Sequence, residues 1–123
     1  MKKTAAPSFL AGGGEMGARL RAFDWSRTPI GDPASWPSSL RTLVAILLAS
    51  NQPMFVAWGD ERTFLYNDFY APILGKKHPA ALGTDFLDAW HEIRADLEPL
   101  VTAAYGGEPT QMNDIALLMH RHG

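Results

Sequence analysis

Cysteine is absent from the 123-residue sequence, and this absence removes several kinds of chemistry at once. The chain can form neither a disulfide framework nor a thiolate metal site. It also offers no cysteinyl nucleophile and no cysteine for a covalent flavin adduct. The sequence therefore excludes the mechanisms that depend on a thiol.

A strong charge of one sign is missing as well, because 11 Lys and Arg residues face 13 Asp and Glu residues, for a formal net charge of −2. This balance creates no basic field of the kind that attracts nucleic acid or anionic lipid. With 46% hydrophobic and 20% charged residues, the composition is typical of one globular domain with a single core. We therefore expect a folded module without a nucleic-acid partner.

Long hydrophobic runs are lacking too. The opening "MKKTAAPSFLAGGG" starts with two lysines, but Pro7 and Ser8 interrupt its apolar stretch, so no signal-peptide core forms. The longest apolar run elsewhere, "LVAILLAS", is far shorter than a membrane span. These features predict no membrane insertion, a cytoplasmic location, and a flexible N-terminal arm over residues 1–14.

Residues 15–52, the block after this arm, have the pattern of a helical extension. Met16, Leu20 and Phe23 recur at helical spacing, and the prolines and glycine that follow predict a loop.

A second helix is predicted from about Pro37 to Ala49, with Ser35 as its cap and Pro37 in its first turn. Its spacing predicts a helix that packs on a core. A helix that binds a partner or forms a dimer is the alternative, and the two roles are compatible. The apolar residues recur at steps of three and four: Leu40, Leu43, Val44, Leu47 and Leu48.

Two short aromatic strands follow, "MFVAW" and "TFLYN", separated by the polar turn "GDER". This arrangement predicts a β-hairpin. In the first strand Phe55 and Ala57 point to one face. Met54, Val56 and Trp58 point to the other. Both faces are apolar and need cover, so we expect the helix that starts near Pro37 to lie over the second one.

Several short helices are predicted after the hairpin. Asn67 or Asp68 is placed to cap the first of them, and Gly75 is placed to end it. The segment "KKHPAALG" (76–83) predicts one further helical turn, and "TDFLDAWHEI" (84–93) and "RADLEPLVTAAYGG" (94–107) predict two amphipathic helices. Alternation then predicts a final strand over Met112 to Met119.

This order of elements resembles the first two thirds of a PAS domain. The common features are a strand–turn–strand unit, an asparagine at the end of the second strand, and short helices before a longer connecting one. The phrases "FDWSRTPIGDPASWPSSLRTLVAILLAS", "PMFVAWGDERTFLYNDFYAPILGKKHPAALG" and "WHEI" look like the N-terminal PAS modules of bacterial sensor histidine kinases. The resemblance covers residues 15–123.

The resemblance implies an α+β fold with an antiparallel sheet, short helices on one face and the N-terminal helix on the other. Residues 53–123 would be a partial PAS core, because the last two strands of a complete PAS sheet would follow residue 123. A sheet without them would expose strand edges, so we expect a homodimer or a higher oligomer. The sequence has no ATP-binding glycine box, so a histidine kinase effector would belong to a longer parent protein.

In a PAS arrangement eight side chains would line the space between sheet and helices, as candidate ligand-binding residues. A filled core and a ligand cavity both fit such a set. A buried Tyr66 phenol needs a hydrogen-bond partner, which a small apolar or aromatic ligand with one polar group, or a backbone carbonyl, would supply. The candidates are Phe55, Phe64, Tyr66, Tyr70, Phe86, Trp90, Ile93 and Leu97.

The sequence requires no cofactor. His91–Glu92 begins like a zinc-protease helix, but residue 95 is alanine, so the second ligand is missing. Some PAS sensors hold a haem through a histidine on the connecting helix, which makes His91 the haem candidate beside an inert helical histidine. His120 and His122 could hold a metal or belong to a frayed chain end.

Charged residues of the second half predict solvated surfaces. Lys76, Lys77 and His78 form a small basic patch that we interpret as a soluble loop. The acids have no identifiable convergent partner for acid–base catalysis, so they predict a solvated helix face: Asp85, Asp88, Glu92, Asp96 and Glu98.

These features together predict a non-catalytic sensory module. The state of a ligand or partner would change the packing of the pocket, and the sheet would pass this change to a dimer interface or an effector. A purely structural dimerisation module is one alternative. A small enzyme that uses His91 and Glu92 is another.

Overall fold

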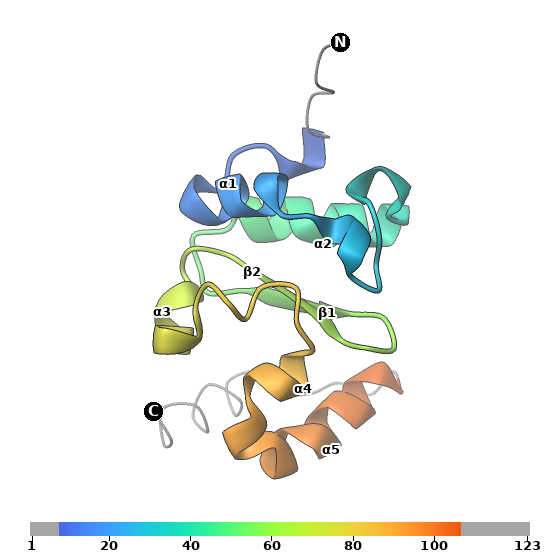
Figure 1. The fold of residues 1–123 in the computed structure, drawn as a ribbon, viewed down its shortest axis with the longest axis vertical. Helices are drawn as coiled ribbons and strands as arrows, with labels where there is room; N and C mark the ends of the chain where they lie inside the picture. Colours follow the sequence, from blue (N-terminus) through green and yellow to red (C-terminus); the bar gives the residue numbers. More distant parts are fainter. Residues whose placement is uncertain (1–7, 107–123) are drawn as a thin grey trace. The chain divides into compact units, whose positions relative to one another are not determined.

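The computed structural model describes residues 8–106, which divide into two compact units at the boundary between Phe86 and Leu87. The prediction of a mixed α+β chain with an antiparallel hairpin is confirmed. The predicted strand at Met112 to Met119, and His120 and His122, lie outside the described residues. In chain order the elements (Figure 1) are η1 (Ser8–Leu10), α1 (Gly14–Ala22), η2 (Trp25–Arg27), η3 (Pro33–Ser35), α2 (Ser38–Ala49), β1 (Phe55–Trp58), β2 (Thr63–Tyr66), α3 (Ala71–Leu74), η4 (Gly75–Lys77), α4 (Phe86–Ala89), η5 (His91–Ile93) and α5 (Arg94–Tyr105).

The hairpin of the first unit has the predicted strands and turn. β1 and β2 pair antiparallel, with Phe55 opposite Tyr66. Residues 83–86 run along the other edge of β2, where the Phe64 N–H donates to the Thr84 carbonyl and the Phe64 carbonyl accepts from the Gly83 N–H (2.9 and 2.8 Å). β2 therefore lies between β1 and this segment, and all of its residues are buried.

α2 packs against β1 as predicted (Figure 1). One of its leucines lies outside the buried face. Leu40, Val44, Leu47 and Leu48 are buried, whereas Leu43 is 40% exposed. At 3.6 residues per turn the buried four span an arc of about 100°, and Leu43 falls about 40° outside it. The prediction that Leu43 belongs to the buried face is therefore wrong.

The start of α2 also differs from the prediction. Pro37 is the N-cap and the helix begins at Ser38. Ser35 ends the preceding turn η3, where the Asp32 side chain accepts a hydrogen bond from the Ala34 N–H. The prediction of Ser35 as the cap of α2 is wrong, because the acid upstream of Pro33 starts a separate 3-10 turn.

α1 matches its predicted helix, and the chain is ordered in front of it. Residues 8–14 were predicted to belong to a flexible arm, yet Leu10 is 1% exposed. The Arg21 guanidinium donates to the carbonyls of Leu10 and Gly12, at 2.7 and 2.9 Å. A Cβ at Gly17 would collide with the Gly12 carbonyl, so this close approach needs glycine. The predicted arm boundary at residue 14 is therefore too late.

Asn67, at the end of β2, is 2% exposed and uses its whole side-chain amide. Its Nδ2 donates to the carbonyls of Leu47 and Gln52, at 3.0 and 2.9 Å. Its Oδ1 accepts from the N–H groups of Met54 and Tyr70, at 3.2 and 3.0 Å. Asn67 therefore joins α2, the entry to β1 and the turn into α3.

Asp68 caps a different helix from the predicted one. Its carboxylate accepts from the N–H groups of Glu15 and Met16, at 3.1 and 2.7 Å. The first N–H groups of a helix have no intrahelical acceptor and attract negative charge. Asp68 therefore closes the N-terminus of α1.

The later helices are shorter than predicted, apart from α5. α3 ends at Leu74, and Gly75 follows it at the predicted stop, with a φ of +57° that suits glycine. The predicted helix over residues 84–93 is wrong, since α4 and η5 are separated at Trp90, which has φ −106° and ψ 40°. No helix in residues 8–106 is long and apolar enough to cross a membrane.

Leu43 and Leu47 give a matched test of which face of α2 is buried. We expect Leu47→Asp to lower the free energy of unfolding by more than about 3 kcal/mol, because an unpaired charge would enter a site that is 0% exposed. Leu43→Asp should change it by less than about 0.5 kcal/mol. Urea denaturation measures both, and equal effects would contradict the assignment of the buried face.

Asn67 and Thr63 give a second test. Both are buried, but within residues 8–106 only the Asn67 side chain has hydrogen-bond partners. Asn67→Ala should cost at least about 2 kcal/mol, since four backbone groups lose their partner. The Thr63 hydroxyl has no hydrogen-bond partner among the described residues. Thr63→Val should therefore be neutral or stabilising in the same denaturation experiment. A large loss in Thr63→Val would reveal a partner for that hydroxyl.

Candidate functional site

Five of the eight predicted pocket residues come together in the first unit as an aromatic cluster: Phe55, Phe64, Tyr66, Tyr70 and Phe86. Phe55 stacks on Phe86 with centroids 4.7 Å apart, and Phe64 meets Phe86 edge-on at 5.1 Å. Tyr66 contacts Phe64 at 5.1 Å and Tyr70 at 5.9 Å. Such spacings are those of rings in direct contact. The rings of the cluster therefore pack directly against one another.

Alternation explains how the hairpin builds this cluster. Phe55 of β1 and Phe64 and Tyr66 of β2 share one face of the hairpin. Tyr70 comes from the turn before α3, and Phe86 ends the segment that runs along β2 and begins α4.

The other three predicted pocket residues belong to the second unit. Trp90 is 6% exposed, Ile93 is 2% exposed and Leu97 is 0% exposed. Trp90 separates α4 from η5, Ile93 ends η5, and Leu97 lies in the first turn of α5.

The Tyr66 hydroxyl has a partner that the sequence did not indicate. It lies 2.7 Å from Nδ1 of His78. His78 was predicted to belong to a soluble basic loop, and this is wrong, because its side chain is only 18% exposed. The partner is therefore an imidazole, and neither a ligand nor a backbone carbonyl is needed to satisfy the phenol.

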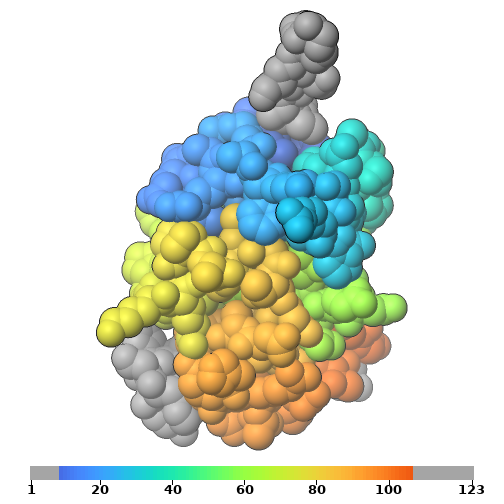
Figure 2. All heavy atoms as spheres, viewed as in Figure 1, coloured from blue at the N-terminus to red at the C-terminus, as the bar shows by residue number. Residues whose placement is uncertain are grey.

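A row of polar contacts continues from this hydrogen bond to α1. Nε2 of His78 lies 3.7 Å from Oε2 of Glu15, which accepts a hydrogen bond from Nε of Arg19 at 2.9 Å. The N-terminal segment that carries α1 (blue) and the segment after α3 (yellow) adjoin on the surface shown in Figure 2. A surface hollow of about 350 Å³ lies beside the row, lined by Glu15, Asp68, Ala71, Pro72, Gly75 and His78.

Burial and charge set the protonation of the two ends of this row. Burial raises the pKa of Tyr66 to about 12, with a smaller contribution from the negative charge of Glu15 and an opposing one from Arg19. The hydrogen bond from Arg19, and then its charge, lower the pKa of Glu15. Tyr66 is therefore a neutral phenol, and Glu15 a carboxylate, at neutral pH.

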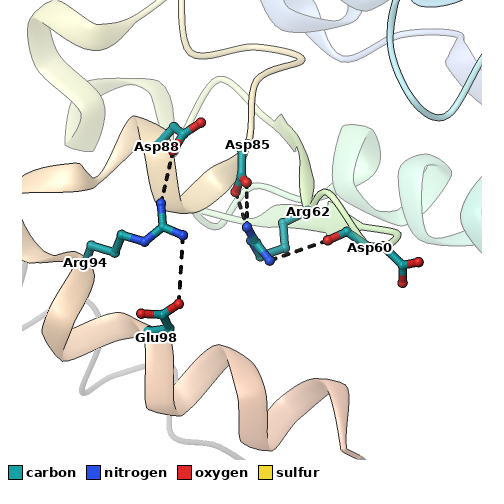
Figure 3. Close-up of polar contacts among 6 residues, drawn as sticks. All are labelled: Asp60, Arg62, Asp85, Asp88, Arg94 and Glu98. Atoms are coloured by element: carbon teal, nitrogen blue, oxygen red, sulfur yellow. Dashed lines mark hydrogen bonds and ion pairs between the residues drawn. The ribbon is translucent and has the colours of Figure 1, made fainter.

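The predicted acidic face divides between the two units (Figure 3). In the first unit Asp85 makes a two-point ion pair with Arg62, with N–O distances of 2.9 and 2.6 Å, and its side chain is 19% exposed. The prediction of a solvated helix face is wrong for Asp85, because Arg62 reaches it from the hairpin turn. In the second unit Arg94 contacts Asp88 and Glu98, both mostly exposed.

Of the predicted metal and haem candidates, only His91 lies within the described residues. His91 is exposed in η5, before α5 begins. No group of three or more His, Asp and Glu side chains within residues 8–106 is arranged to hold a metal ion.

Comparisons of the chain with protein-family models, curated proteins and solved structures gave no match.

The raised pKa of Tyr66 predicts an alkaline loss of stability. Between pH 10 and about 12 the unfolded chain loses the phenol proton while the folded chain keeps it. The free energy of unfolding should therefore fall in this range, by at most about 1.4 kcal/mol per pH unit. Urea denaturation at several pH values measures this slope.

Tyr66→Phe is the control for this measurement, because it keeps the ring and removes the ionising group. The slope should be smaller in Tyr66→Phe than in the wild type. Identical slopes in the two proteins would show that Tyr66 does not resist ionisation.

Proposed function

We propose that this chain is a non-catalytic sensory module of PAS type, which binds a small apolar or aromatic ligand and passes its state to an effector domain or a partner. The observation that best supports this proposal is the order of elements after α2. A hairpin is followed by short helices and then by α5, and Asn67 is buried at the end of the second strand. This order and this asparagine carry the resemblance to PAS modules.

The chemistry of the aromatic cluster supports the ligand class. Its rings offer flat apolar surfaces, and the Tyr66 hydroxyl and His78 offer hydrogen-bonding groups beside them. A planar molecule with one polar group would replace the ring contacts and bond to one of these two residues.

The close packing of the cluster supports a two-state mechanism. Phe55 and Phe86 are stacked at 4.7 Å, so a molecule that enters between them must separate them. The free and bound states would then differ in the packing of the hairpin. A ligand shifts such an equilibrium by its difference in affinity for the two states. A filled cluster is therefore compatible with a sensor, provided that the rings move.

A structural dimerisation module is the second candidate, and the exposed side of α2 favours it. Leu43 is 40% exposed and Ile46 is 50% exposed, and they lie one turn apart. A stable dimer buries about 800 Å² per partner, which is far more than two leucine-sized side chains supply. The pair could contribute to a homodimer of the sensor, but it does not by itself account for the buried aromatic cluster.

Purification under native conditions tests the proposal. We expect mass spectrometry of a solvent extract to reveal one small aromatic or apolar compound. This compound, added back to stripped protein at one hundred times its Kd, should stabilise the fold by about 2.7 kcal/mol. Tyr66→Phe should weaken the binding, and Ile46→Ala, on the exposed face of α2, should leave it unchanged.

The opposite result identifies the second candidate. If no compound is extracted and light scattering finds a dimer that Leu43→Asp converts to a monomer, the chain is a structural dimerisation module. A stripped protein whose stability does not respond to the extracted compound would also contradict the sensory proposal.

A further inference from the structure

His78 stands between two elements that are far apart in the sequence. On one side its Nδ1 is 2.7 Å from the Tyr66 hydroxyl, which belongs to β2 and the aromatic cluster. On the other side its Nε2 is 3.7 Å from the Glu15 carboxylate of α1. Its side chain is 18% exposed and forms part of the wall of the surface hollow. The imidazole therefore has two polar partners and open space to turn into.

The two partners favour different charge states of the imidazole. A neutral imidazole has one nitrogen that accepts a hydrogen bond, and an imidazolium has none. Tyr66 is a neutral phenol near neutral pH, and burial raises its pKa further, to about 12, so its hydroxyl proton needs an acceptor. Nδ1 of a neutral His78 supplies it, and Nε2 then carries the other proton and faces Glu15.

Protonation of His78 removes this acceptor. The phenol oxygen could accept a hydrogen bond from Nδ1–H, but its own proton would then need another acceptor in a site that is 0% exposed. The Glu15 carboxylate has the opposite preference, because it attracts the imidazolium. The hydrogen bond from Arg19 lowers the pKa of Glu15, so this carboxylate stays charged when the pH falls below neutral.

The other charged groups around His78 do not change which partner each charge state of the imidazole favours. Asp68 lines the same hollow and is negative, although its carboxylate is hydrogen-bonded to the N–H groups of α1. Arg19 lies behind Glu15 and is paired with it. Lys76 and Lys77 precede His78 in η4. Two carboxylates therefore stand on the hollow side of the imidazole, and a phenol stands on the buried side.

We propose that His78 is a pH-dependent clasp between the aromatic cluster and α1. The neutral imidazole holds the Tyr66 hydroxyl, and the imidazolium releases this hydroxyl and turns toward Glu15. Acidification thereby changes the hydrogen bonding of a buried residue of the cluster. The proposal needs no ligand, so it does not depend on the sensory function proposed above.

Nuclear magnetic resonance of the whole chain tests the clasp. Correlation spectra of the histidine and tyrosine rings are recorded between pH 8 and pH 5, the range in which histidine side chains commonly change charge. We expect the Tyr66 ring signals to shift together with those of His78 and with the same midpoint. Constant Tyr66 signals, during a transition of His78, would overturn the proposal.

Three variants locate the effect. In His78→Gln the side-chain amide can accept the Tyr66 proton without changing charge, so the Tyr66 shift should disappear. In Glu15→Gln the midpoint should move to lower pH, because the imidazolium loses an anionic neighbour. His91→Gln, in the second unit, is the matched control and should leave the transition unchanged. The clasp would be overturned if the Tyr66 signals still shifted with pH in His78→Gln. It would also be overturned if the midpoint in Glu15→Gln were the same as in the wild type.

Discussion

The side-chain amide of Asn67 is the interaction on which the first unit depends. It satisfies two carbonyl groups and two N–H groups of the backbone in a site that is 2% exposed. Asparagine suits this position, because its amide has two N–H donors and an oxygen that accepts twice. An aspartate would lack the donors, and an apolar residue would leave all four backbone groups without this partner. The end of α2, the entry to β1 and the turn after β2 therefore keep one arrangement.

The neighbours of Asn67 extend this junction in two further directions. Tyr66 points into the aromatic cluster and reaches His78, and Asp68 closes the N-terminus of α1. Three consecutive residues thereby connect the cluster, the hairpin and both N-terminal helices. A change in the position of the end of β2 would reach all of these elements through the backbone. In the sensory function proposed above, this connection would be a short physical path from the rings to the helices.

Local sequence patterns predicted the elements of this junction, but they did not predict the contacts between residues that are far apart in the sequence. Alternation in β1 and β2 identified the face that carries Phe55, Phe64 and Tyr66, because side-chain direction in a strand follows from position alone. The partners of these elements follow from tertiary packing. His78 lies 12 residues from Tyr66 and Asp68 lies 52 residues from Met16, and no spacing rule joins such pairs. Leu43 was misplaced for the same reason, since the positions of η1, α1 and β1 around α2 decide which edge of its apolar stripe is covered.

The two contacts of α1 with the residues after β2 involve different groups. Asp68 accepts two hydrogen bonds from backbone N–H groups in the first turn of α1. His78 approaches the Glu15 side chain of the same turn. Movement of His78 alone would leave the Asp68 contact in place, so α1 would stay attached to the hairpin. The consequence of the clasp is therefore expected inside the aromatic cluster, where Tyr66 loses its acceptor, rather than in the attachment of the helix.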